Sequence, residues 1–455
     1  MAPEHIRFGG GAAETILHPV VACWMLVAVI LIMILSRRRA GTAFLLACFT
    51  IPIGQVVLVG GLHFTVLRIL ILAGLARRTF LRPSEKFPGR FNRIDQALVF
   101  WTISALALNS LDWMDNQALI HNLGDFVDAM GGYLVVRFMI PDRDAILRTI
   151  KVLAVICLIQ GVCMINEQIT HINVFGLLGG VPIDVTLREG KIRSQGVLGC
   201  INAGTFAGIL IPLFIWLWTE QRSQMTACVG IAAALAMIFA SNSSTSLMAL
   251  GGGLLGLAFW SVRRQMNLVR RGLALALLAL HLVMNGPVWS LIARVDLTGS
   301  SSSYHRYYLV DNLIRHFSDW WLLGCKDYAN WGWDMWDTCN QFVDVALKGG
   351  LLTLVLYILI LKRSFAAIGN ARKQVTGNRR QEWLLWCLGS ALFANVIGSF
   401  GINYMAQLLM LLFMLLACIS TATFETRTPF LSTQAKDQAH FASHHSPMET
   451  ELILG

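Results

Sequence analysis

Charged residues are scarce in this chain. Of its 455 residues only 14% are Asp, Glu, Lys or Arg, whereas 56% are hydrophobic and the mean hydropathy is +0.61. A soluble protein of this length needs far more charge to cover its surface. The scarcity of charge therefore excludes a soluble globular protein and predicts an integral membrane protein.

Long polar stretches are also few, and apolar runs of about 17 to 22 residues separate them, roughly what a helix needs to cross the hydrocarbon core. We expect an all-α, polytopic transmembrane helix bundle of about 12–13 spans. The number is twelve if the hairpin 42–76 is partly re-entrant. The expected spans are 18–35, 42–59, 64–76, 94–110, 122–140, 149–165, 196–218, 225–240, 245–260, 272–286, 341–361, 383–399 and 402–420.

Positive charge is absent from most connections on one side. Lys and Arg gather in alternate connections, such as 37–39, 77–93, 263–271 and 362–380. Positively charged connections stay in the cytoplasm, so the bias predicts the cytoplasmic face. It also explains the net charge of +10 without a nucleic-acid partner. With thirteen spans the N-terminus lies outside, and the "SRRR" after the first span is a stop-transfer pattern.

The sequence divides into three regions, and no internal repeat is visible. Residues 1–165 form N-terminal transmembrane helices, and 166–420 form a transmembrane core that includes a large outer loop, 287–340. The tail, 421–455, is polar and is expected to be disordered and cytoplasmic. Its His residues have a spacing that fits no metal site, so we expect no metal there.

Cysteines outside the expected spans are few. Only Cys325 and Cys339 lie there, both in the large outer loop. On an oxidising face they could form a disulfide, and the alternative is two free thiols that face protein.

The large outer loop is rich in aromatic residues. They are Trp320, Trp321, Tyr328, Trp331, Trp333 and Trp336. One interpretation is an interfacial aromatic belt. The other is a platform on which sugar rings stack, because an indole face fits the apolar face of a sugar and its N–H donates to a hydroxyl.

Two arginines stand on the face where the charge bias disfavours them. Arg193 lies just before the seventh span, and Arg306 lies in "SSSYHRYYLVDNLIRH". Two guanidiniums can hold a diphosphate through paired hydrogen bonds. The alternative is that each snorkels to lipid phosphate or pairs with a nearby Asp.

Few ionisable residues fall inside the expected spans. Asp344 and Lys348 are four residues apart and share one helix face. They either neutralise each other or line a polar site, since buried charge faces the protein interior or water. Arg68 lies where it could reach the same space, and Arg137 is expected to snorkel to the cytoplasmic surface.

Four segments, in order, resemble the O-antigen ligase and polysaccharide polymerase family of bacterial inner-membrane proteins. They are "IRSQGVLGCINAGTFAGILIPL" (192–213), "FASNSSTSLMALGGGLLGL" (239–257), "YHRYYLVDNLIRHFSDWWLLG" (304–324) and "DTCNQFVDVALKGGLLTLVLYI" (337–358). The resemblance covers roughly 190 to 420.

This resemblance implies an inverting glycosyl transfer at the periplasmic face that needs no metal or cofactor. The donor would be a glycan on undecaprenyl diphosphate, and the acceptor either another lipid-linked glycan (polymerase) or lipid A-core (ligase). Arg193 and Arg306 match the positions that hold the diphosphate. The residues themselves, apart from the resemblance, suggest Trp333, Trp336, Asp344 and Lys348 as further substrate contacts. A chain-length regulator and a flippase would be expected partners.

The sequence departs from the family at one position. Ligases carry a His before the Asn that corresponds to Asn340, where this chain has Thr338 and Cys339. Asp337 is the best substitute as general base, with Asn340 beside it. Asp327, Asp334, His305 and His316 are further candidates. Two other classes stay open: a lipid-linked oligosaccharide flippase, and an inactive family member that binds glycan.

Overall fold

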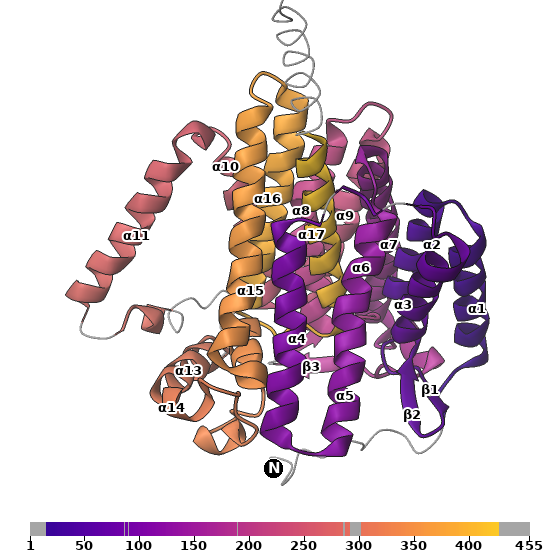
Figure 1. The fold of residues 1–455 in the computed structure, drawn as a ribbon, viewed down its shortest axis with the longest axis horizontal. Helices are drawn as coiled ribbons and strands as arrows, with labels where there is room; N and C mark the ends of the chain where they lie inside the picture. The colour runs from indigo at the N-terminus through magenta and orange to yellow at the C-terminus, as the bar shows by residue number, and fades with distance from the viewer. Residues whose placement is uncertain are drawn as a thin grey trace, which may run out of the picture.

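The chain folds as a bundle of helices (Figure 1). The computed structural model describes residues 15–85, 87–89, 91–188, 190–284, 287–291 and 302–426. Eight helices in these ranges are long and apolar enough to cross a membrane, and α1 and α10 are shorter apolar helices. The prediction of an all-α, polytopic transmembrane bundle is therefore confirmed, and the chain is a multi-pass membrane protein.

The N-terminal helices are α1 Pro19–Ile34, α2 Arg37–Thr50, α3 Val66–Ala76, α4 Arg93–Trp113, α5 Asn116–Phe126, α6 Gly132–Met139 and α7 Arg143–Thr170. The π-helical turn Val127–Gly131 joins α5 to α6. The later helices are α8 Cys200–Trp218, α9 Gln224–Ser241, α10 Ser244–Ala258, α11 Met266–Val283, α13 Ser302–Arg315, α14 Phe317–Trp320, α15 Gln341–Gln374, α16 Arg379–Ser399 and α17 Ala406–Glu425.

The second expected span, 42–59, is helical only as far as Thr50, so the prediction of a helix is wrong for the rest of this range. Helix α2 ends at Thr50, and residues Val56–Val59 form strand β1, which pairs antiparallel with β2, Leu62–Thr65. Gly60 and Gly61 have φ of +58° and +81°, a conformation that glycine adopts without strain, so they turn the chain between the strands. An apolar run rich in Val can form a strand as well as a helix, and the two glycines decide the outcome here.

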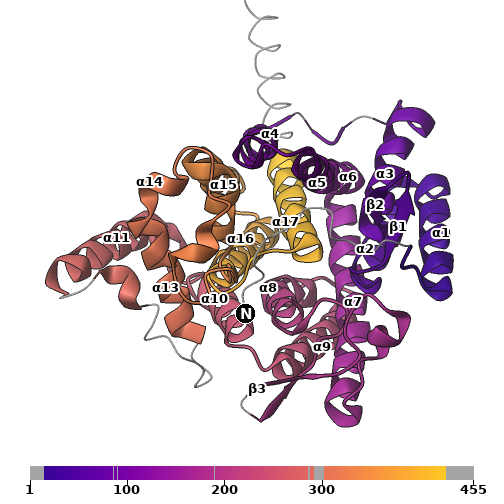
Figure 2. The same ribbon diagram turned by 90° about the horizontal axis from the view of Figure 1, so that it is seen from below.

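The apolar core centres on α17. In the most apolar 18-residue stretch of α17, 89% of the residues are buried, because neighbouring helices surround it on nearly all sides (Figure 2). Helix α11, by contrast, has no buried residue and stands apart from the bundle (Figure 1). A second, smaller core lies under α13 and α14. It contains Leu309, Leu313, Trp320, Met335, Val343, Ala346 and Leu347.

Ion pairs gather the basic connections at one end of the bundle. Arg38 pairs with Asp142 at 2.5 Å, and Arg143 pairs with Glu220 at 2.7 Å. At the same end Glu382 is 3.2 Å from Arg263 and 3.0 Å from Arg372. The connections that the charge pattern assigned to one side therefore meet there. We call this end the basic face, and the opposite end, with α13, α14 and both β-hairpins, the loop face (Figure 1).

Helix α15 is broken near its start, and the break holds the loop in place. Gly349 and Gly350 have non-helical backbone angles, which free main-chain groups of the helix. The Leu351 N–H donates to the Trp321 carbonyl at 2.8 Å, and the Cys325 N–H donates to the Leu347 carbonyl at 2.9 Å. The segment after α14 is thus attached to α15 through the main chain.

Three further expectations change. The boundary at 165 falls inside α7, and α17 continues to Glu425 before the tail begins. The remainder of the tail (427–455) and loop residues 292–301 lie outside the described residues. Arg137 does not snorkel, because it is 1% exposed and lies 3.5 Å from Asp95, a buried carboxylate that satisfies its charge.

Candidate functional site

Arg193 reaches the turn between α9 and α10. It ends strand β4 (Lys191–Arg193), which pairs with β3 (Thr186–Arg188). The turn holds this strand because the Ser194 N–H donates to the Ala240 carbonyl at 3.0 Å and the Asn242 amide to the Ile192 carbonyl at 2.6 Å. The Arg193 Nε then lies 3.4 Å from the Ser241 carbonyl, and the side chain is buried. No carboxylate pairs with Arg193 among the residues described.

Arg306 reaches the same turn from α13. Its guanidinium donates to the Ser244 hydroxyl at 3.1 Å and to the Thr245 hydroxyl at 2.8 Å, and it is 5% exposed. The two arginines predicted to act together come from distant segments of the chain, and the Ser-rich turn brings them to one place.

This turn is also the N-terminus of α10. Ser243, at the N-cap position, makes no side-chain capping hydrogen bond. The first N–H groups of a helix carry partial positive charge and favour an anion. The Ser244 hydroxyl adds a further donor, whereas the Thr245 hydroxyl donates to the Gly401 carbonyl at 3.2 Å. The turn with Arg193 and Arg306 therefore has the charge and the donors to bind an anion, and we call it the arginine site.

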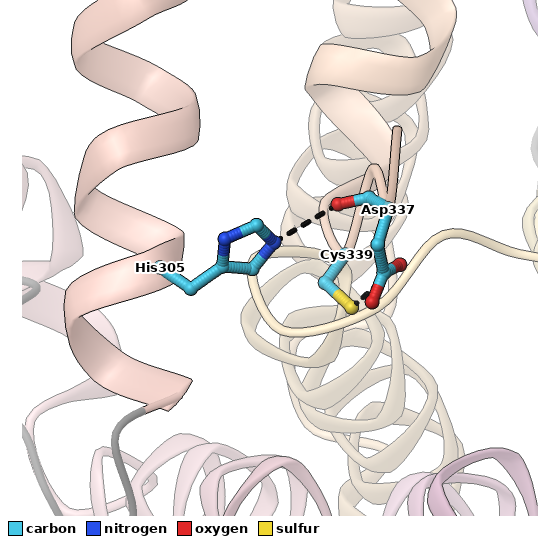
Figure 3. A group of neighbouring side chains, drawn as sticks. All are labelled: His305, Asp337 and Cys339. Carbon is cyan, nitrogen blue, oxygen red and sulfur yellow. Dashed lines mark hydrogen bonds between the residues drawn. The ribbon is translucent and has the colours of Figure 1, made fainter. Parts of the chain in front are cut away.

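Asp337 lies beside His305 and Cys339 (Figure 3). The His305 Nε2 is 3.0 Å from the Asp337 main-chain carbonyl, and the Cys339 thiol donates to an Asp337 carboxylate oxygen at 3.0 Å. His305, an alternative base in the sequence, does fold back to this segment. His316 lies elsewhere: its ring stacks on Trp331 at 4.6 Å and pairs with Asp319, whose pKa this hydrogen bond lowers.

Both loop cysteines are free thiols in the structure. Burial, followed by the nearby negative charge of Asp337, raises the pKa of the Cys339 thiol. Burial also raises the pKa of the Cys325 thiol. Both sulfurs are therefore protonated at neutral pH, and the thiol of Cys339 is a donor to Asp337.

The side chain of Asn340, predicted to take part in catalysis, caps a helix in the structure. It is 1% exposed, and its side-chain oxygen accepts from the Phe342 N–H at 2.9 Å and the Val343 N–H at 3.3 Å. Asn340 is thus the N-cap of α15 and fixes where the helix starts. Its neighbour Thr338 donates to Asp344 at 3.3 Å, which links the Asp337 segment to the helix.

A cavity of about 330 Å³, lined by both apolar and polar residues, lies between α4, α5, α15 and the start of α17. Asp344 and Lys348 line it and pair at 2.9 Å. Asp128, another lining residue, pairs with Arg68 at 2.7 Å, so Arg68 lies behind this carboxylate and is not itself among the lining residues. The cavity also has polar groups that the sequence alone did not indicate, namely Asn109, Asn122, Asp125, Gln341 and Asn403.

The loop aromatics divide into two groups. Trp320 is buried, and Tyr328 and Trp331 pack against the small core. Trp333 and Trp336 are 74% and 51% exposed, so these two predicted contacts are open to a ligand or to lipid. Trp333 also lies edge-on to His305, with ring centroids 6.4 Å apart.

The comparisons with known proteins add no family. No protein-family model matches the chain, and no curated protein matches it. The geometry of the arginine site, the Asp337 segment and the cavity therefore carries the functional argument.

Proposed function

We propose that the chain transfers a glycan from a polyprenyl diphosphate carrier at the loop face, as a polymerase of O-antigen or exopolysaccharide repeat units in a bacterial inner membrane. One observation carries the proposal: two buried arginines, Arg193 and Arg306, meet the N-terminus of α10 at a single turn. A diphosphate is the anion that best matches two guanidiniums and a helix N-terminus.

The chemistry assigns roles to these residues. The acceptor hydroxyl oxygen attacks the anomeric carbon and forms the new glycosidic bond. The bond from that carbon to the diphosphate oxygen breaks, and the electron pair leaves with the diphosphate. Asp337 takes the hydroxyl proton. Arg193 and Arg306 stabilise the diphosphate charge, which grows as the bond breaks.

The acceptor distinguishes two reactions within this class. A polymerase adds the glycan to another lipid-linked glycan, and a ligase adds it to lipid A-core. The polymerase is favoured because Thr338 and Cys339 stand where a ligase has its His. The amide and carboxylate groups of the cavity suit the hydroxyls of a sugar acceptor.

The test removes each arginine from the full-length protein reconstituted in lipid vesicles. With a lipid-linked repeat unit as substrate, Arg193→Ala and Arg306→Ala should each reduce polymer formation at least about 100-fold, the scale on which loss of one stabilising donor slows a reaction. Arg315→Ala is the matched control, because Arg315 lies on α13 too, but its side chain is 70% exposed and pairs with Asp311. Unchanged polymer in both test variants contradicts the proposal.

A flippase is the second candidate, and the cavity favours it. Charged groups on several helices, including Asp125, Asp128 and Lys348, line a space within the bundle, as a transport path requires. A deletion strain separates the classes. Single repeat units that accumulate on the carrier at the periplasmic face indicate a polymerase, and long polymer without transfer to lipid A-core indicates a ligase. Units trapped at the cytoplasmic face indicate a flippase.

A further inference from the structure

His305, Asp337 and Cys339 form a cluster of three potential metal ligands outside the arginine site. Their ligand atoms all lie within 4.8 Å of one another, and each side chain is half-buried. His305 comes from α13, whereas Asp337 and Cys339 come from the segment that leads into α15 (Figure 3). The His305 Nε2 points to the Asp337 main-chain carbonyl, and the Cys339 thiol points to the Asp337 carboxylate (Figure 3).

The three donors differ in kind, and the difference selects the metal. Imidazole nitrogen, thiolate sulfur and carboxylate oxygen are together the ligands that Zn²⁺ takes, whereas Ca²⁺ and Mg²⁺ take oxygen. Ligands of a tetrahedral Zn²⁺ stand about 2.0 to 2.3 Å from the ion, hence roughly 3.3 to 3.8 Å from each other. Cys339 Sγ and Asp337 Oδ1 are 3.0 Å apart, and all three ligand atoms lie within 4.8 Å of one another, so side-chain rotations that adjust these separations would bring the ligands around one ion.

We propose that His305, Asp337 and Cys339 bind one Zn²⁺ ion, with a fourth position left for solvent. Binding replaces two hydrogen bonds: the thiol loses its proton to solvent, and the imidazole exchanges the Asp337 carbonyl for the ion. The site is anchored at both ends, because α13 is fixed through Arg306 and the Asp337 segment through Asn340 and Thr338. Because the segments that carry the three ligands are already held in place, ordering the ligands around an ion costs less conformational entropy.

Binding is measured on the full-length protein in detergent, with a non-chelating reductant that keeps both loop thiols reduced. Titration with Zn²⁺ should give one ion per chain, and Co²⁺ should produce a thiolate-to-metal absorption band. Cys339→Ser and His305→Gln should each weaken Zn²⁺ at least tenfold, and Cys339→Ser should abolish the band. Cys325→Ser and His316→Gln are the matched controls in the same loop and should leave both signals unchanged.

Two results overturn the proposal. One is the absence of stoichiometric Zn²⁺ binding in the reduced wild-type protein. The other is binding that persists unchanged in both Cys339→Ser and His305→Gln, provided that each variant retains the thermal unfolding midpoint of its control. Neither the Zn²⁺ titration nor the Co²⁺ absorption band requires a glycan substrate, so these measurements test the metal site separately from the proposed glycan transfer.

The site has a regulatory consequence that rests on the proposed function. A carboxylate that binds Zn²⁺ is no longer free to accept a proton, so Zn²⁺ should inhibit polymer formation in the wild-type protein. Inhibition should be lost in Cys339→Ser, which keeps Asp337. Zn²⁺ that binds through these three residues without slowing transfer would separate the metal site from the reaction.

Discussion

Asp337 makes contacts through both its main chain and its side chain. The main-chain carbonyl accepts from His305, and the carboxylate accepts from the Cys339 thiol, a weak donor. Asp334, three residues earlier, has a φ of +58° and accepts the Asp337 N–H with its carbonyl. The turn at Asp334 thus sets the direction of the segment.

Asp337→Asn tests the base directly. The amide preserves the size and one accepting oxygen but cannot take a proton, so polymer formation should fall about 10² to 10⁴-fold. The measurement is the initial rate in vesicles with lipid-linked repeat units. Asp334→Asn is the control, because its contact to Asp337 is through the main chain. Equal rates for Asp337→Asn and wild type would exclude Asp337 as the base.

The sequence singled out several residues of the candidate site without showing how they meet. The charge bias disfavours Arg193 and Arg306 on that face, which is why the sequence indicates them. The structure places both at the turn between α9 and α10, with Arg193 at the Ser241 carbonyl and Arg306 at the Ser244 and Thr245 hydroxyls. That contact depends on tertiary packing, which one sequence does not encode locally. Asn340, predicted as catalytic, precedes the apolar run of α15, a pattern that also indicates an N-cap.

Helix α15 is the element whose shape most affects the site. Gly350 has a φ of +67°, and a Cβ there would lie 2.6 Å from the Leu322 carbonyl oxygen. Gly324, with a φ of +109°, faces the Leu347 carbonyl in the same way. The "KGG" in the sequence lies within an otherwise regular apolar helix pattern. We expected a continuous span there, and the break follows from two glycines that the outer segment contacts.

Gly350→Ala should destabilise the protein, because alanine adds backbone strain of about 1–3 kcal/mol and a contact with Leu322. The measurement is the thermal unfolding midpoint in detergent. Gly369→Ala is the control: it lies in the same helix, and a Cβ there meets nothing within 4 Å. Alanine favours a helix by up to about 1 kcal/mol, so this variant should match or exceed the wild-type midpoint. If Gly350→Ala has the same unfolding midpoint as the control, the break in α15 accepts a side chain at this position and the prediction is wrong.

At the scale of the whole molecule, the charge pattern predicted the architecture well. It assigned alternate connections to two faces, and ion pairs such as Arg143–Glu220 and Arg263–Glu382 join the connections of one face. The charge pattern is informative because positively charged connections are retained on one side of a membrane wherever they occur in the sequence. The packing of helices against one another follows no comparable pattern of residue types. The isolation of α11 and the cavity between α4 and α15 depend on packing, and the sequence predicted neither.

Accessibility tests which face is cytoplasmic. In a variant whose exposed native cysteines Cys23 and Cys228 are replaced by Ser, Ser318→Cys should react with a membrane-impermeant thiol reagent in cells with a permeabilised outer membrane. Thr376→Cys should react only after lysis, since it lies among the basic residues between α15 and α16. The readout is the mass shift of the purified protein. The reverse pattern would invert the topology and move the arginine site to the cytoplasm.

The attachment of the outer segment to α15 also sets an order on biosynthesis. The main-chain groups that hold Trp321 and Cys325 belong to Leu351 and Leu347, which leave the ribosome later. While α15 is still within the ribosome and the translocation machinery, α13 and α14 have no partner for these hydrogen bonds. The loop segment therefore cannot make these two hydrogen bonds until α15 has been synthesised, and only then can the segment with Asp337 take its final place beside His305.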